Sequence, residues 1–337
     1  MKQHASKSPV TRARIRQFRT ITLLLAFAGV ALILLVLEGS IRRVAGDRVN
    51  VQYTTRNLFR DSLYAPLTHG WKSGETGSCC GTPVSINSLG TRGPEIDLSL
   101  PTEKLLLLGD SVLFGPGIPD SATISGILRD STQYTIINSA VIGYNTIDYV
   151  QVLKFWQRKT HLNHVLLFLC LNDIYRYTTV TRSSGIIDAI LARLRSNSKL
   201  YMVLKNLVSD RSKYYFLHDL AVFTASDTSF SSAMQDLLKI RDLCASESIS
   251  LRVIVLPYEY QIRMRQDKSY WQPQRMLADF FVRHQIPFSM PDTTIFKPNE
   301  SASYYLYADG IHFSRTGQRV LAEYVLDEYR KSQSSAN

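Results

Sequence analysis

The sequence is poor in cysteine and shows no recognisable metal-binding pattern. It contains only four cysteines in 337 residues, with no Cys-x-x-Cys pair and no His-rich spacing. This excludes a zinc site of the usual ligand spacing, so we expect no metal and no other cofactor. If the folded domain lies outside the cytoplasm, a disulfide between Cys244 and either Cys79 or Cys80 remains an open alternative.

The chain also lacks a phosphate-binding loop and internal repeats. The glycine-containing stretch from Gly74 to Gly81 has no Gly-Lys-Ser/Thr ending, and that ending is what lets such a loop hold phosphates. Low complexity is confined to the Ser-rich last few residues. A nucleotide-binding loop and a repeat architecture are therefore both excluded.

Acidic residues are missing from the N-terminus, where basic residues are frequent. No acid precedes Glu38, whereas six basic residues do: Lys2, Lys7, Arg12, Arg14, Arg16 and Arg19. The net charge of +11 is thus concentrated at one end, which argues against nucleic-acid binding as its explanation. The run from Thr20 to Leu37 has no charge and approaches the ~20 residues that span a bilayer as a helix.

These features predict a membrane-anchored domain. We expect a basic cytoplasmic segment over 1–19, a transmembrane signal anchor over 20–38, a stalk or surface segment over 39–85 and a folded domain over 86–332. The basic flank should stay in the cytoplasm, which places the domain outside the cell membrane (in the periplasm of a Gram-negative cell). A cleaved signal peptide is the alternative, but no Ala-x-Ala-like site follows Leu37.

Short apolar runs alternate with helical patterns from Lys104 onward. Strands are predicted over 105–108, 134–138, 165–169, 251–256 and, more weakly, 286–288, with helices over 123–129, 147–159, 231–247, 273–284 and 315–329. Such alternation is typical of an α/β fold, a parallel sheet with helices on both faces. Ligands of these sheets bind beyond the carboxyl ends of the strands.

A candidate nucleophile stands at one such strand end. Ser111 follows the run Leu105–Leu108 and a Gly-Asp pair, and Asp309 and His312 lie three residues apart before the last predicted helix. A serine hydroxyl needs a base to take its proton and a third group to orient that base. His312 is the one histidine of seven with an acid three residues before it in a predicted loop. Together these residues predict a serine hydrolase.

Four motifs, in this order, resemble the blocks of the SGNH/GDSL hydrolase family. They span roughly residues 85–330 and read Gly109-Asp110-Ser111, Asn138 with Gly143, Asn172-Asp173, and Asp309-Gly310-Ile311-His312. The third block departs from the family because Cys170 stands where a glycine is usual, which could narrow the site or alter the turn before Asn172. Singly, each motif also fits an ordinary turn or helix cap.

The resemblance implies a fold and a role for each matching residue. The fold would be the family's flavodoxin-like three-layer sheet. Ser111 would be the nucleophile, His312 the general base and Asp309 the residue that orients the imidazole. The N–H groups of Ser111 and Gly143 and the side-chain amide of Asn172 would form the oxyanion hole, where preorganised donors stabilise the developing charge.

Two further segments have no place in a minimal layered sheet. Residues 175–230 contain two helical patterns, 186–195 and 200–207, with interleaved basic residues. They predict a helical insertion, either packed on the domain or serving as a cap beside the active site or as a basic amphipathic surface near anionic lipids. In the segment upstream of the nucleophile, Arg92 is expected to be structural, with contact to an acidic substrate group as the alternative.

Three functions remain open. The first is a serine-dependent acyl-ester hydrolase acting on O-acyl, in particular O-acetyl, esters outside the cytoplasm. The second is an O-acyltransferase that modifies a cell-surface polysaccharide, which shares the acyl-enzyme and differs only in the acceptor. The third is a non-catalytic carbohydrate-binding protein with the same fold. The expected partners are a small acyl ester or acylated glycan and the membrane, with no nucleic acid.

Overall fold

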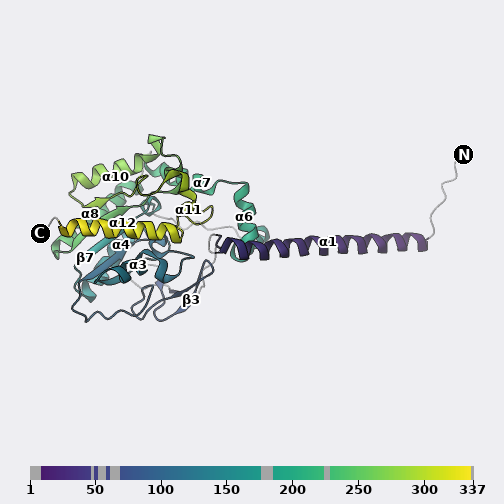
Figure 1. The fold of residues 1–337 in the computed structure, drawn as a ribbon, viewed down its shortest axis with the longest axis horizontal. Coiled ribbons are helices and arrows are strands. Elements are labelled where there is room, and N and C mark those ends of the chain that lie inside the picture. The colour runs from purple at the N-terminus through teal and green to yellow at the C-terminus, as the bar shows by residue number, and fades with distance from the viewer. Residues whose placement is uncertain are drawn as a thin grey trace.

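The N-terminal part of the chain is one long helix that extends away from a folded domain (Figure 1). The computed structural model describes residues 9–46, 49–51, 58–60, 69–175, 185–223 and 228–334. Helix α1 runs over Pro9–Ala45, further in both directions than the expected span of 20–38. Of the helices described, it alone is long and apolar enough to cross a bilayer, a property that signal sequences share. Its central apolar side chains are exposed.

Five parallel strands form the central sheet of the domain. They are β5 (Lys104–Leu108), β6 (Thr135–Asn138), β7 (His164–Leu169), β8 (Ser250–Val255) and β9 (Phe288–Ser289), in the order β6-β5-β7-β8-β9. In register, Leu106 of β5 lies opposite Ile137 on one side and Val165 on the other. The strands read as continuous apolar runs because helices cover both faces. The predicted strands are confirmed to within two residues at each end.

The helices form two layers around this sheet. Helix α4 (Thr146–Lys159) packs on α8 (Thr228–Ser246), and α3 (Ile124–Ser131) packs on α12 (Arg315–Ser334). The chain moves from β5 to β6 in one direction and from β6 onward in the other. Right-handed crossovers therefore place α3 on one face, and α4, α8 and α10 (Gln272–Arg283) on the other. The predicted α/β fold is confirmed.

Short elements complete the domain. The strand pairs are β1 (Phe59–Arg60) with β2 (Gly70–Trp71) and β3 (Thr76–Cys79) with β4 (Thr82–Ser85). The short helices are α2 (Ser111–Phe114), α9 (Glu259–Arg263) and α11 (Ser301–Tyr304). The 3-10 helices are η3 (Asp120–Ala122), η4 (Leu171–Ile174), η5 (Ala221–Phe223), η6 (Lys268–Trp271) and η7 (Pro298–Glu300).

The expectation of a stalk over 39–85 is wrong for the described residues of that segment beyond α1. Trp71 is fully buried, its ring stacks on Phe114 with 4.4 Å between centroids, and its Nε1 donates to the carbonyl of Ala140. The hairpin β3–β4 adds Cys79 and Val84 to the core. The described part of this segment beyond α1 therefore packs on the folded domain, since Leu58, Trp71, Cys79 and Val84 all belong to its core.

Three α-helices precede α8 in the described residues of the insertion, where two were predicted. They are α5 (Ile186–Asn197), α6 (Lys199–Leu207) and α7 (Arg211–Leu220). Helix α7 belongs to the main core, since Phe216 is buried among Tyr258, Tyr260 and Tyr270. Helix α5, by contrast, buries none of its residues. No disulfide joins Cys244 to Cys79 or Cys80 among the described residues, so the structure does not support that alternative.

Candidate active site

The turn after β5 positions Ser111 at the carboxyl end of the sheet. Asp110 caps the short helix α2 by accepting from Val112 N (2.8 Å), and the helix ends at Gly115 with φ of +74°. A side chain at Gly109 would meet Leu113 at 2.8 Å, so only glycine fits there. Ser111 thus occupies the first position of a helix that is capped at both ends. It follows β5, the strand at which the strand order reverses: β6 lies on one side of β5 and the later strands lie on the other.

The loop before α12 holds the acid and the base on one tight turn. Asp309 Oδ1 accepts from the backbone N of His312 (2.8 Å) and of Ile311 (3.1 Å). The same oxygen lies 2.8 Å from Nδ1 of the His312 ring. Gly310 has φ of +80°, and a Cβ there would meet Ser212 of α7 at 2.5 Å. The turn is therefore built against the insertion.

The three predicted residues meet in space. Nε2 of His312 lies 2.8 Å from Oγ of Ser111. Burial opposes ionisation of Asp309, but the positive charge and hydrogen bonds of His312 outweigh it and lower the pKa of Asp309 to about 2. Burial opposes ionisation of His312 as well and by itself would lower its pKa. The negative charge of Asp309 and its hydrogen bond outweigh burial and raise the pKa of His312 to about 9. The carboxylate thus favours an imidazole that accepts a proton readily.

Asp110 is a second acceptor beside the serine. Its Oδ2 lies 3.1 Å from Ser111 Oγ and accepts from the Asn172 amide at 3.2 Å. The other end of that amide, Oδ1, lies 3.4 Å from the hydroxyl of Tyr258, which donates to Asp219 at 2.5 Å. Asn172 is thus oriented by Asp110, with its NH2 group turned toward the nucleophile's neighbour.

Gly143 reaches the site less directly than the other predicted residues. Its loop follows β6 and is joined to the turn before Ser111 by the bond from Val141 N to Gly109 O (3.4 Å). Ile142 lines the cavity that contains Ser111. Gly143 has φ of +84°, a left-handed conformation that favours glycine. Among the described contacts it makes no hydrogen bond to Ser111, Asp309 or His312.

The departure from the family pattern at Cys170 does not distort the turn. Its backbone has φ of −95° and ψ of 155°, an extended conformation open to any residue. Its N–H donates to Asp173 (2.8 Å), whose pKa is raised by burial and by the nearby Asp110 charge. The thiol is buried beside Tyr258. The glycine is therefore dispensable at this position.

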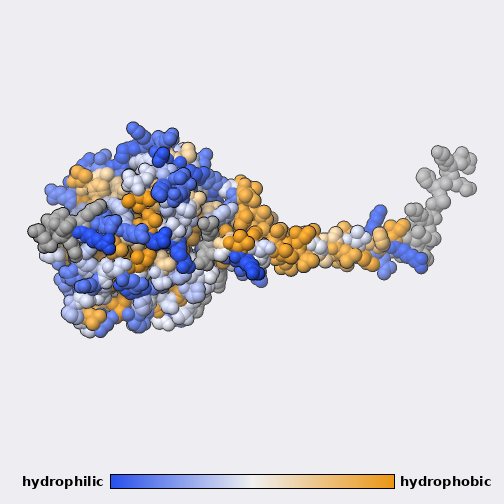
Figure 2. Space-filling model, viewed as in Figure 1, coloured by the Kyte–Doolittle hydropathy of each residue, from blue (hydrophilic) through white to orange (hydrophobic). Residues whose placement is uncertain are grey.

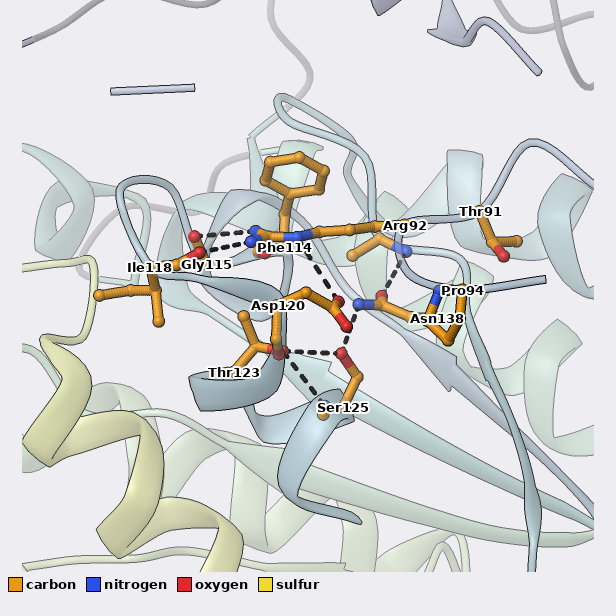
Figure 3. A network of polar contacts seen from close by, with 12 residues as sticks. Thr91, Arg92, Pro94, Phe114, Gly115, Ile118, Asp120, Thr123, Ser125 and Asn138 are labelled. Carbon is orange, nitrogen blue, oxygen red and sulfur yellow. Dashed lines mark hydrogen bonds and ion pairs between the residues drawn. The ribbon is translucent and has the colours of Figure 1, made fainter. Parts of the chain in front are cut away.

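Arg92 has the structural role that the sequence suggested. Its guanidinium is buried and donates to the carbonyls of Phe114, Gly115 and Ile118, the segment that leaves the nucleophile helix (Figure 3). It also lies over the Phe114 ring, 4.7 Å from the centroid, and 3.9 Å from Asp120. With its donors so engaged, Arg92 fixes the loop after Ser111 and does not face the cavity.

The cavity beside Ser111 has a volume of about 260 Å³. Residues from widely separated parts of the chain line it: Asn50, Val51, Cys79, Cys80, Pro116, Ile142, Met202, Arg211, Leu306, Tyr307, Asp309 and His312. Most of this lining is apolar, with Arg211 as its one basic side chain other than the histidine. A small acyl group therefore has room next to the serine, and longer groups can continue along the apolar wall.

Sequence reasoning missed several residues that hold this site together. Glu259 is buried and accepts from Ser212 (2.5 Å), Ser301 (2.8 Å) and Arg263 (3.0 Å), so it joins α7, α9 and α11 beneath the Asp309 turn. The hydroxyl of Tyr258 donates to Asp219 and lies 3.4 Å from the Asn172 amide oxygen. Glu259 and Tyr258 both follow β8, and the rule that sites gather at the carboxyl ends of parallel strands was the available signal.

No protein-family model matches the chain, and no curated protein matches it. Solved structures similar to it include a lipase/acylhydrolase from Enterococcus faecalis, at 16% identity over 68% of this chain and 96% of that one, with a TM-score of 0.41. A psychrotrophic esterase from Pseudoalteromonas sp. has 12% identity over 69% and 99%, with a TM-score of 0.43. A catalytic mutant of an acetylxylan esterase from Geobacillus stearothermophilus has 15% identity over 67% and 93%, with a TM-score of 0.39. These values are too low to transfer a role to any residue of this chain.

Proposed function

We propose that this chain is a serine-dependent acyl-ester hydrolase with a site of the SGNH/GDSL type, anchored in the membrane by α1. The observation that carries the proposal is the continuous relay from Ser111 Oγ through the His312 ring to Asp309, with 2.8 Å at each step. The order of the four sequence blocks agrees with it. O-acetyl esters fit the small cavity volume of about 260 Å³.

The chemistry follows from the relay. Ser111 Oγ attacks the ester carbonyl carbon while its proton passes to Nε2 of His312, and Asp309 stabilises the resulting imidazolium. The tetrahedral intermediate collapses as the C–O bond to the alcohol breaks, and His312 returns the proton to that alcohol. Water then attacks the acyl-enzyme with the same base, releasing the acid and restoring the serine.

The negative charge of the intermediate needs donors. We assign them to the N–H groups of Ser111 and Gly143 and to the side-chain amide of Asn172. Asn172 is held by Asp110, which supports a preorganised donor, and such donors cost no reorganisation during the reaction. In this assignment one hydrogen of the Asn172 NH2 group keeps its bond to Asp110 Oδ2 and the other donates to the oxyanion.

The direct test is chemical labelling of the full-length protein in detergent or nanodiscs. A fluorophosphonate should add one covalent group to Ser111, located by peptide mass spectrometry, and the protein should hydrolyse p-nitrophenyl acetate. Ser111→Ala should lose both while keeping its thermal unfolding midpoint. Turnover that is equal in Ser111→Ala and the parent would overturn the proposal and favour a non-catalytic binding protein.

Acyl transfer is distinguished in the same assay. An oligosaccharide acceptor added with the ester should remain unmodified if water is the acceptor. Acetylated sugar detected by mass spectrometry, with release of free acetate suppressed, would favour the transferase.

The orientation of α1 is tested by a reporter fused after Glu38, which should lie on the external side. A cytoplasmic reporter would overturn the location.

A further inference from the structure

An acidic side chain of α1, Glu38, caps the second helix of the insertion. The carboxylate of Glu38 accepts from the N–H groups of Lys199 (3.0 Å) and Leu200 (2.8 Å) and from the hydroxyl of Ser198 (2.8 Å), so it caps the N-terminus of α6. Arg42 pairs with Glu38 and also donates to the carbonyl of Asn197. The first turn of α6 therefore lies at the level where the apolar run of α1 ends.

From that point α6 runs across the direction of α1, not along it (Figure 1). A helix that crosses a bilayer-spanning helix at the end of its apolar run lies in the plane of the interface. The amide of Lys199 begins the helix, and its side chain donates to the carbonyl of Gly46 at 2.6 Å. Contacts at Glu38 and Arg42 of α1, and at Gly46 just past its end, thus hold this crossed arrangement.

The outward faces of α5 and α6 are apolar and uncovered. On α5, Ile187 and Ile190 are 73% and 55% exposed, and Leu194, on the same face, is also exposed. On α6 and just beyond it, Leu207 and Val208 are 71% and 85% exposed. Figure 2 shows hydrophobic surface on these helices continuing from that of α1. Because the two surfaces are continuous, the bilayer that surrounds α1 can also cover the exposed faces of α5 and α6.

Charge around this face is predominantly basic. Residues 185–209 carry Arg193, Arg195, Lys199 and Lys205 against the single acid Asp188. Apolar side chains on one side of a helix with basic ones at its border are typical of segments that rest on anionic lipid. A second protein chain is the alternative cover for an apolar face. The basic border and the continuity with α1 favour the bilayer over such a partner.

The catalytic cavity lies at this same end of the molecule. Asn50 and Val51, which line it, follow the end of α1 at Ala45 by five and six residues, a reach of at most about 21 Å. Met202 of α6 is 3% exposed and forms another part of the lining. Helix α6 therefore lines the site through Met202, while its C-terminal end carries the exposed Leu207 and is followed by the exposed Val208.

We propose that the outer faces of α5 and α6 are a second membrane contact, resting on anionic lipid headgroups beside α1. This contact holds the Ser111 cavity at the bilayer surface, so that its substrate is an acyl ester carried by, or partitioned into, the membrane. The statement about substrate rests on the proposed hydrolase activity. The statement about the membrane contact does not.

Depth measurements on the full chain in nanodiscs of phosphatidylcholine and phosphatidylglycerol test the contact. Single cysteines at Ile187 and Leu207 carry a nitroxide in a Cys80→Ser background, since the other native thiols are buried. The control is Val282→Cys on α10, where an apolar residue is 69% exposed away from α1. The ratio of oxygen to nickel-chelate accessibility should be several-fold higher at 187 and 207 than at 282, and higher with anionic lipid.

Equal ratios at all three positions would overturn the membrane contact. Labels at 187 and 207 that are shielded from both reagents, in a protein that is dimeric by light scattering, would overturn it in favour of a second copy. For the substrate, Ile187→Glu with Leu207→Glu should lower hydrolysis of a vesicle-embedded ester about tenfold and leave p-nitrophenyl acetate hydrolysis unchanged. A parallel loss with Val282→Glu, or no loss in the double variant, would overturn that part.

If no variant hydrolyses any ester and the phosphonate does not label Ser111, the proposed function fails while the depth result stands. If labelling succeeds and the depth ratios are flat, the membrane contact fails alone. The two proposals are therefore separable in one set of samples.

Discussion

Ser111 and His312 are 201 positions apart in the sequence, and Ser111 Oγ lies 2.8 Å from Nε2 of His312. The serine has one proton and two acceptors within reach, because Asp110 Oδ2 lies 3.1 Å away on its other side. When His312 is protonated, it donates to the serine, which then donates to Asp110. Only a neutral imidazole leaves the serine proton directed at the base.

This relationship predicts the pH profile. Activity requires neutral His312, whose pKa is raised to about 9, so kcat/KM for p-nitrophenyl acetate should rise with pH across the range from 6.5 toward 9. The Asp110 charge contributes to raising that pKa. Asp110→Asn should therefore move the rising limb to lower pH. Asp130→Asn, an exposed acid on α3, should leave it in place, and an unmoved limb in Asp110→Asn would contradict the role given to Asp110.

The second prediction concerns the oxyanion donor. Asn172→Ala should lower kcat by roughly 10²–10³-fold, since one preorganised donor is lost at the transition state. Tyr258→Phe removes the hydroxyl near Asn172 Oδ1 (3.4 Å) but leaves the amide in place, so its loss of kcat should be clearly smaller. Steady-state kinetics on both variants measure this. A change confined to KM in Asn172→Ala would show that the amide binds the substrate's ground state instead.

The sequence was sufficient for the sheet and for the three residues of the relay. Continuous apolar runs mark the strands because both faces are buried, and Ser111, Asp309 and His312 lie in loops with recognisable spacing. Both kinds of signal are local. Helix α1 was likewise visible as an uncharged run, although its length was underestimated because the flanking basic residues are also good helix formers.

What could not be predicted depends on contacts between distant segments. Trp71 stands in a polar stretch with no periodicity, and only the folded structure shows its ring on Phe114. Glu38 looks like the end of the apolar run, and its capping of α6 joins residues 160 positions apart. The left-handed conformation and close packing of Gly310 are also invisible in an Asp-x-x-His motif, because Ser212 approaches from another helix.

That packing gives the third prediction. Gly310→Ala should lower both the unfolding midpoint and kcat, because φ is +80° and the new Cβ would lie 2.6 Å from the backbone Cα of Ser212. Gly74→Ala is the matched control, with φ of +72° and nothing within 4 Å. In the control, only the cost of placing alanine at a positive φ should lower the free energy of unfolding, by about 1 kcal/mol, and kcat should be unchanged. Equal effects in the two variants would show that the approach of α7 does not position the Asp309 turn.

The last prediction concerns the cysteine that replaces the usual glycine. Cys170→Gly should leave kcat unchanged, because residue 170 already has an extended backbone that glycine shares, and Asn172 keeps its contacts to Asp110 and Tyr258. The free energy of unfolding should fall by about 1–3 kcal/mol, because a buried side chain is lost and glycine increases the backbone entropy of the unfolded chain. Denaturant unfolding and ester hydrolysis measure the two effects separately. Cys244→Ala, a buried thiol on α8, should likewise lose stability without losing kcat. A gain of activity specific to Cys170→Gly would show instead that the thiol narrows the site.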